Sequence, residues 1–219
     1  MSIKDNLLKI KSVLPEHVTL VAVSKTKPVS DLMEAYNAGQ RIFGENKIQE
    51  MTEKWEQMPK DIQWHMIGHI QTNKVKFMAP YVSLIHGVDS LKLLEEINKQ
   101  ALKNDRIIDC LLQIHIAEEE TKFGLNELEL NEILSSESFK NLNNIKIVGL
   151  MGMATFTNNK NQIQKEFEQL KVVYDTKKSL SIVNCQLSIL SMGMSGDYQL
   201  AIECGSTMVR IGSSIFGGR

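Results

Sequence analysis

Two lysines lie two positions apart at the end of an apolar run near the N-terminus. The stretch VAVSKTKP, residues 21–28, places Lys25 directly after Ser24 and Lys27 directly before Pro28. Removing an ammonium group from water is costly, so a lysine that ends a buried strand needs a reason. A lysine against an apolar wall loses some preference for its charged form, and a neutral amine forms Schiff bases with carbonyl groups. The stretch therefore predicts either a nucleophilic amine or a solvated, ion-paired lysine.

Glycine and serine residues near the C-terminus predict a site for an anion. Gly205 and Gly212, in GSTMVRIGSS (205–214), would let the backbone approach a ligand closely. Ser195, in SMGMSGD (191–197), could cap a helix and offer its hydroxyl group and its amide to the same anion. An ordinary turn uses the same residue types, so the position of each stretch in the fold decides between the two interpretations.

The cysteine and histidine residues do not indicate a metal site or a disulfide framework. The three cysteines, Cys110, Cys185 and Cys204, form no CxxC pair. His65 and His69 lie four positions apart in HMIGH, a spacing that suits a metal on a helix when a glutamate accompanies it. We expect a strand here, which separates them by about 13 Å at ~3.3 Å per residue. We therefore expect no metal.

The composition gives no reason to expect nucleic acid or a membrane as a partner. The chain has 219 residues, of which 42% are hydrophobic and 23% charged, and its formal net charge is −1. A near-neutral chain has no overall attraction to nucleic acid or to an anionic membrane. No stretch approaches the ~20 apolar residues that span a bilayer, and the N-terminal segment lacks the apolar core of a signal peptide. We expect a cytoplasmic protein.

Short apolar runs alternate with helical segments along the chain. After an amphipathic helix that ends at Pro15, eight apolar runs predict strands at 18–24, 41–46, 64–69, 84–89, 109–116, 145–153, 187–193 and 207–212. Helices are predicted between them at 29–38, 47–56, 72–79, 90–102, 127–136, 161–178 and 195–203. Eight such units predict one α/β domain over 1–219, a (β/α)8 TIM barrel with an extra amino-terminal helix. An open doubly wound sheet is the alternative.

The carboxyl ends of the strands are where chemistry collects in either architecture. These ends carry Lys25 after the first strand, Ser195 after the seventh, and the glycine-serine loop 212–214 after the last. A Schiff-base lysine and a phosphate site on one rim suggest pyridoxal 5′-phosphate (PLP). A class I aldolase would use the same pair, but it also needs acid–base groups deeper in the barrel, and the sequence offers no convincing set.

The sequence also resembles a known family over nearly its whole length. The stretches that carry the resemblance are AVSKTKP (22–28), FGEN with the following Gln49-Glu50 (43–50), WHMIGHIQTNK (64–74), TKFG (121–124), GLMGM (149–153), SMGMSGD (191–197) and GSTMVRIGSSIFG (205–217). They are similar to the PLP homeostasis proteins of the YggS/PROSC type, which look like the amino-terminal barrel of fold-type III alanine racemases.

The resemblance implies a set of cofactor-binding residues, which are Lys25, Asn46, Met194, Ser195, Arg210, Gly212 and Ser213. It places a covalent aldimine on Lys25, Arg210 at the pyridine nitrogen, and Asn46 beside the ring. It places Gly212 and Ser213 at the phosphate, where Ser195 and the Met194 backbone add contacts. A guanidinium group stays charged, so Arg210 would disfavour protonation of the pyridine nitrogen and weaken the ring as an electron sink.

Three further positions have no assigned role. Lys122 is a neighbour of the ring in the resemblance. His69 stands where many relatives have proline, and His115 where many have asparagine.

The resemblance implies a protein that carries or buffers PLP and maintains vitamin B6 and amino-acid homeostasis. The racemases have a second domain that supplies a tyrosine acid–base from the partner subunit, whereas this sequence ends at SSIFGGR. We therefore expect little or no catalysis and assign no catalytic residues. The alternative is a PLP-dependent amino-acid racemase or lyase. The expected partners are PLP and PLP-requiring apoenzymes, and we expect a monomer.

Overall fold

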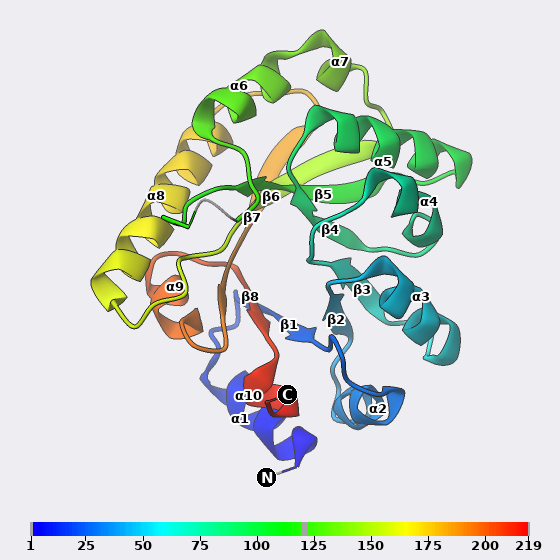
Figure 1. Ribbon diagram of the computed structural model, residues 1–219, viewed down its shortest axis with the longest axis vertical. Helices are drawn as coiled ribbons and strands as arrows, with labels where there is room; N and C mark the ends of the chain where they lie inside the picture. The colour runs from blue at the N-terminus through cyan, green and yellow to red at the C-terminus, as the bar shows by residue number, and fades with distance from the viewer. Residues whose placement is uncertain (1, 120–121, 219) are drawn as a thin grey trace.

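The computed structural model describes residues 2–119 and 122–218, and within them eight parallel strands close into a barrel. The strands follow chain order around the ring, and the last pairs with the first (Figure 1). They are β1 (Thr19–Val23), β2 (Ile42–Glu45), β3 (Gln63–Met66), β4 (Leu84–Val88), β5 (Ile108–Ile114), β6 (Ile145–Gly152), β7 (Cys185–Met194) and β8 (Met208–Ile211). The predicted barrel is confirmed. The open sheet is excluded because the pairing runs from β1 to β8 in order and returns to β1, which leaves no edge strand among the eight.

Helices surround the ring of strands (Figure 1). They are α1 (Ile3–Val13), α2 (Val29–Asn37), α3 (Ile48–Gln57), the 3-10 helix η1 (Thr72–Lys74), α4 (Val75–Met78), α5 (Leu91–Lys103), α6 (Glu127–Ser135), α7 (Glu137–Lys140), α8 (Lys160–Lys178), α9 (Tyr198–Glu203) and α10 (Ser213–Phe216). The expected extra helix is α1, which lies beside α10. Asn6 Nδ2 donates to the Ile215 carbonyl oxygen at 3.1 Å and ties these two helices together.

The strands are apolar because both of their faces are covered. Every residue of β4 and β8 is buried, as expected for strands that face side chains inside the barrel and helices outside it. A small cluster that packs separately from the main core takes one residue from each of five strands, namely Val21, Leu84, Leu111, Met151 and Met208. The large cluster packs the strands against the helices.

The predicted boundaries differ from the observed ones in a few places. The strand predicted over 64–69 ends at Met66, so His69 lies in the loop that follows β3. The four-residue helices α7 and α10 were not predicted, because a single turn shows no helical periodicity. Among the described helices, none combines the length and the apolar character that crossing a bilayer requires.

Candidate functional site

A cavity of about 410 Å³ opens at the carboxyl ends of the strands, where β1 and β8 meet. Its volume lies in the range of small-molecule sites. The predicted residues that line it are Lys25, Met194, Ser195, Arg210, Gly212 and Ser213. Asn46 lines an adjoining cavity of about 660 Å³ instead, and Lys25 lines both. The structure thus brings six of the seven predicted residues together and places Asn46 on the far side of Lys25.

The amines of Lys25 and Lys27 are engaged differently. Lys27 Nζ donates to the carbonyl oxygens of Phe216 and Gly218, both at 3.0 Å. Lys25 is half-buried in the cavity wall, and its Nζ makes no hydrogen bond or ion pair with any residue in 2–119 or 122–218. Of the two lysines, Lys25 is therefore the one whose amine is available to a ligand.

Ser195 lies against the backbone amides that follow β8. Its Oγ accepts hydrogen bonds from Gly212 N at 3.2 Å and from Ser214 N at 3.4 Å. A hydroxyl group beside converging N–H groups can also bind an anionic oxygen. A Cβ at Gly212 would lie 3.0 Å from the Val23 carbonyl oxygen, so a side chain at this position would crowd the backbone of β1. Gly205 does not line the cavity; it follows α9 with φ +95°, so the ligand contact expected there is wrong.

Arg210 brings a buried positive charge to the cavity. Its Nη1 donates to the Ser191 carbonyl oxygen at 2.9 Å and to Ser191 Oγ at 2.7 Å, and its Nη2 donates to the Gly152 carbonyl oxygen at 3.0 Å. Its Nε–H and second Nη2–H make no hydrogen bond within the described residues. Burial lowers the pKa of Arg210 to about 10, against the opposing effect of Asp197, so the guanidinium stays charged at neutral pH.

A chain of buried polar side chains leads from Arg210 into the barrel. His86 Nδ1 lies 3.1 Å from Ser191 Oγ, and His86 Nε2 lies 3.1 Å from His65 Nδ1. A guanidinium group only donates, so Ser191 Oγ accepts the hydrogen bond from Arg210. The tautomers of the two rings decide which atom donates in the other two contacts. Burial lowers the pKa of His65 to about 3 and that of His86 well below its usual value, so both rings are neutral.

Positive charge exceeds negative charge around the cavity. The charged residues that line it are Lys25, Lys27, Arg210 and Asp197. Asp197 Oδ1 accepts a hydrogen bond from Met194 N at 2.5 Å, and burial raises the pKa of its carboxyl group. No carboxylate of the described chain forms a hydrogen bond with Arg210, and a buried charge without such a partner is costly. The cavity is therefore suited to an anionic ligand.

The loop after β6 forms the opposite wall. Thr155 N and Thr155 Oγ1 each donate to a carboxylate oxygen of Glu166 at 2.6 Å, which ties the loop to α8. Lys122 Nζ donates to the Ala154 carbonyl oxygen at 2.6 Å and pairs with Glu119. Lys122 thus supports this wall and is not among the residues that line the cavity. Thr121, from the TKFG stretch, lies outside the described residues.

His69 and His115 lie on the rim but do not line the cavity. His69 Nδ1 is 3.4 Å from Asp89 Oδ2, and its ring stacks on Phe123 with centroids 3.9 Å apart. His115 Nε2 is 3.1 Å from the Glu119 carbonyl oxygen. Across the described residues, no group of three or more His, Cys, Asp or Glu side chains could hold a metal ion.

Several polar residues of this region were not predicted from the sequence. Asp197 is one, although SMGMSGD places it two residues after Ser195. Ser191, His65 and His86 belong to apolar strands and form their chain only when the barrel closes. Glu45 could have been noticed, because a carboxylate in the apolar run RIFGEN needs a buried partner.

Comparison with known proteins shows the family to which the chain belongs. The family described as "Alanine racemase, N-terminal domain" matches residues 1–219. The chain is 40% identical over 201 residues to the pyridoxal phosphate homeostasis protein of Aquifex aeolicus, covering 91% of this chain and 86% of that protein. It is 36% identical to the Escherichia coli K12 protein of the same name, covering 94% and 87%.

Solved structures match over the same length. PipY of Synechococcus elongatus, determined with PLP bound, superposes with a TM-score of 0.90 at 33% identity, covering 99% of this chain and 100% of that one. An alanine racemase of Clostridium difficile superposes with a TM-score of 0.80 at 17% identity, covering all of this chain and 56% of that one. At 17% identity the racemase likeness concerns the fold alone.

Proposed function

Since the chain belongs to the family of pyridoxal phosphate homeostasis proteins, within the wider alanine racemase N-terminal domain family, we propose that it binds PLP and carries or buffers this cofactor. In this role it contributes to vitamin B6 and amino-acid homeostasis. PLP-requiring apoenzymes are the proposed recipients. We also propose that residues 1–219 act as one cofactor-binding domain, because the walls of the cavity come from both ends of the chain.

The charge of the cavity is the observation that carries this proposal. Lys25, Lys27 and Arg210 face one carboxylate, Asp197, which leaves a formal excess of two positive charges. PLP brings a phosphate group and a ring nitrogen that can accept a hydrogen bond. It also brings an aldehyde, with which a free amine forms a Schiff base. A positively charged cavity with one unengaged amine matches all three features.

The role proposed for each residue follows from its place in the cavity. Lys25 is proposed to attach to the cofactor as an aldimine: its amine adds to the aldehyde carbon and one water molecule leaves. Arg210 is proposed to face the pyridine nitrogen with the N–H groups that the protein leaves free. The proposed phosphate contacts are Ser195, the Met194 backbone, Gly212 and Ser213. Asn46 is proposed to approach the ring from the adjoining cavity.

Little or no catalysis is proposed. Among the residues described around the cavity, none is a histidine, tyrosine or cysteine, and the amine of Lys27 is held by two carbonyl groups. Apart from Lys25, the lining side chain with an ordinary acid–base role is Asp197. Racemisation of alanine at more than about 1 per second would overturn this view and favour a racemase or lyase.

A spectrum and a trapping experiment test the proposed function. The purified protein with added PLP should absorb in the near-ultraviolet to blue range as an aldimine, and borohydride should trap the cofactor on Lys25. Lys25→Ala should abolish the absorbance and keep the fold, whereas Lys27→Ala should retain it. Trapping on Lys27, or no adduct at all, would refute the assignment.

A further inference from the structure

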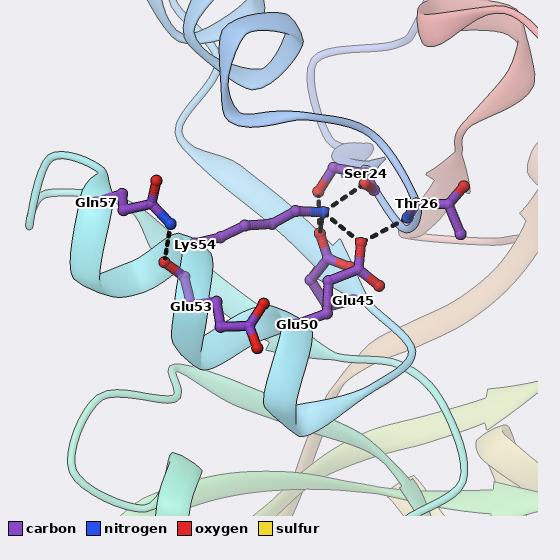
Figure 2. Close-up of polar contacts among 7 residues, drawn as sticks. All are labelled: Ser24, Thr26, Glu45, Glu50, Glu53, Lys54 and Gln57. Atoms are coloured by element: carbon purple, nitrogen blue, oxygen red, sulfur yellow. Dashed lines mark hydrogen bonds and ion pairs between the residues drawn. The ribbon is translucent and has the colours of Figure 1, made fainter.

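A buried lysine lies beneath the turn that carries Lys25. Lys54, on α3, is 5% exposed. Its Nζ donates to Glu45 Oε1 and to Glu50 Oε1, both at 2.7 Å, and to the Ser24 carbonyl oxygen at 2.8 Å (Figure 2). These three bonds use all three donors of the ammonium group. The buried charge is therefore fully partnered, and one of its partners is the backbone next to Lys25.

The two carboxylates also bind the turn. Glu45 Oε1 accepts the Ser24 hydroxyl proton at 2.6 Å, and Glu50 Oε1 accepts the Thr26 backbone N–H at 2.6 Å (Figure 2). The residue before Lys25 is thus held through its hydroxyl group and its carbonyl oxygen, and the residue after it through its amide. We call Glu45, Glu50 and Lys54 the clamp.

Thr26 is held in a strained conformation. Its φ is +64°, in the left-handed region that a β-branched residue rarely adopts. Strain of this kind persists where surrounding contacts enforce it, and it clusters at functional sites. Because the hydrogen bond from the Thr26 amide to Glu50 opposes rotation of this turn, the clamp supplies such a contact next to Lys25.

We propose that Glu45, Glu50 and Lys54 are positioning residues that hold the backbone on both sides of Lys25 and thereby keep its amine in the cavity wall. This inference rests on the proposed attachment of PLP to Lys25. Glu50 also lines the adjoining cavity beside Lys25, but no hydrogen bond or ion pair joins the clamp to the Lys25 amine within the described residues. The clamp holds the turn through the Ser24 hydroxyl group, the Ser24 carbonyl oxygen and the Thr26 amide.

Glu50 is the residue to vary. Its side chain is 23% exposed, whereas Glu45 and Lys54 are almost fully buried. Removing Lys54 would leave the buried Glu45 without its ion pair, and removing Glu45 would take a buried acceptor from both Lys54 and Ser24. Glu50→Ala removes the acceptor of the Thr26 amide, and Glu50→Gln keeps an oxygen acceptor. Glu53→Ala is the matched control, because Glu53 lies on the same helix and its carboxylate binds Gln49 instead of the turn.

Two measurements test the clamp. Hydrogen exchange at the Thr26 amide, measured without cofactor, should become at least tenfold faster in Glu50→Ala. The rate of Schiff-base formation with added PLP should fall by a similar factor. In Glu50→Gln, the exchange rate of the Thr26 amide and the rate of Schiff-base formation should both lie close to those of the unaltered protein. Glu53→Ala should match the unaltered protein in both rates. If Glu50→Ala lowers the free energy of unfolding but changes neither value, Glu50 only stabilises the fold and the proposal is wrong.

A second variant tests the role of strain. Glycine adopts a φ of +64° without penalty, so Thr26→Gly should restore part of the reaction rate in a Glu50→Ala background. No recovery would show that the turn does not depend on the clamp for its conformation. If Thr26 exchange responds as expected but the unaltered protein forms no adduct on Lys25, the proposed function fails while the backbone role of the clamp stands.

Discussion

The direction of the hydrogen bonds behind Arg210 can be tested at the two buried histidines. Arg210 only donates, and we expect the Ser191 hydroxyl group to donate in turn to His86 Nδ1, and His86 Nε2–H to donate to His65. We expect both rings to be neutral with the proton on Nε2, which long-range proton–nitrogen NMR spectra can read. Ser191→Ala removes the hydroxyl group next to His86 Nδ1, so the preference of His86 for the Nε2–H tautomer should weaken. An Nδ1–H tautomer at His86 in the unaltered protein would contradict the proposed direction.

The same two histidines should make stability depend on pH. Burial lowers the pKa of His65 from 6.5 to about 3 in the folded protein, and His86 shifts in the same direction. Between these values the unfolded chain binds more protons, so the free energy of unfolding falls as pH drops below 6.5. The fall is at most about 1.4 kcal/mol per pH unit for each histidine.

Urea unfolding at pH 7.0, 6.0 and 5.0 measures this dependence. His65→Asn should make the dependence of the free energy of unfolding on pH shallower. Equal stability at pH 7 and pH 5 would show that these rings are not buried as neutral groups.

Two glycines of the cavity should respond oppositely to an added methyl group. A Cβ at Gly212 would crowd Val23 of β1, whereas a Cβ at Gly196 meets no atom within 4 Å. Gly212→Ala should destabilise the protein by about 1–3 kcal/mol as an overpacked site does, and Gly196→Ala should not. By displacing the loop, Gly212→Ala should also weaken PLP binding more than pyridoxal binding. Urea unfolding and titration with both ligands measure these effects, and equal losses for both ligands would place the phosphate elsewhere.

At the scale of elements, α8 holds one wall of the cavity through a single buried carboxylate. Glu166 binds Thr155 through two hydrogen bonds. Glu166→Ala should therefore lower the free energy of unfolding by about 3–6 kcal/mol, since each of the two bonds to the charged acceptor contributes about 1.5–3 kcal/mol. It should also speed PLP release. Glu168→Ala, at an exposed position of the same helix, is the control. A Glu166→Ala protein with unchanged release would show that the wall does not retain the cofactor.

The elements themselves were largely predictable from the sequence, because strands buried on both faces read as apolar runs. All eight strands and the longer helices lie close to their predicted ranges. What could not be predicted depends on partners far apart in the chain. Lys54 occupies an ordinary polar position in the sequence of α3. Only the packing of that helix against β2 and β3 brings it to Glu45 and to Ser24, the residue after β1.

The candidate site was predictable to a similar extent, and for a similar reason. The ends of strands locate Lys25, Ser195 and Gly212 on one rim, as any (β/α)8 barrel requires. The position of Asn46 across Lys25 depends on side-chain geometry, which strand order does not determine. The cytoplasmic location and the monomeric state stay predictions.

At the scale of the whole molecule, the cavity spans the point where the barrel closes. β1 pairs with β8 there, and lining residues come from both strands and from the loops that follow them. A ligand that contacts both strands favours the closed barrel over the unfolded chain. Binding should therefore raise the free energy of unfolding of the whole barrel, and its effect should not be limited to the loops of the rim.

PLP should accordingly raise the free energy of unfolding by an amount set by its concentration. For one site the gain is about 2.7 kcal/mol when free PLP is 100 times its dissociation constant, and it grows with the logarithm of concentration. Urea unfolding across a series of PLP concentrations measures the slope, which should equal RT for one site per chain. Lys25→Ala should shift the dependence to much higher concentrations, since the phosphate contacts remain but the covalent bond is lost. Stability that does not change with PLP would mean that the ligand does not bind across the β1–β8 junction.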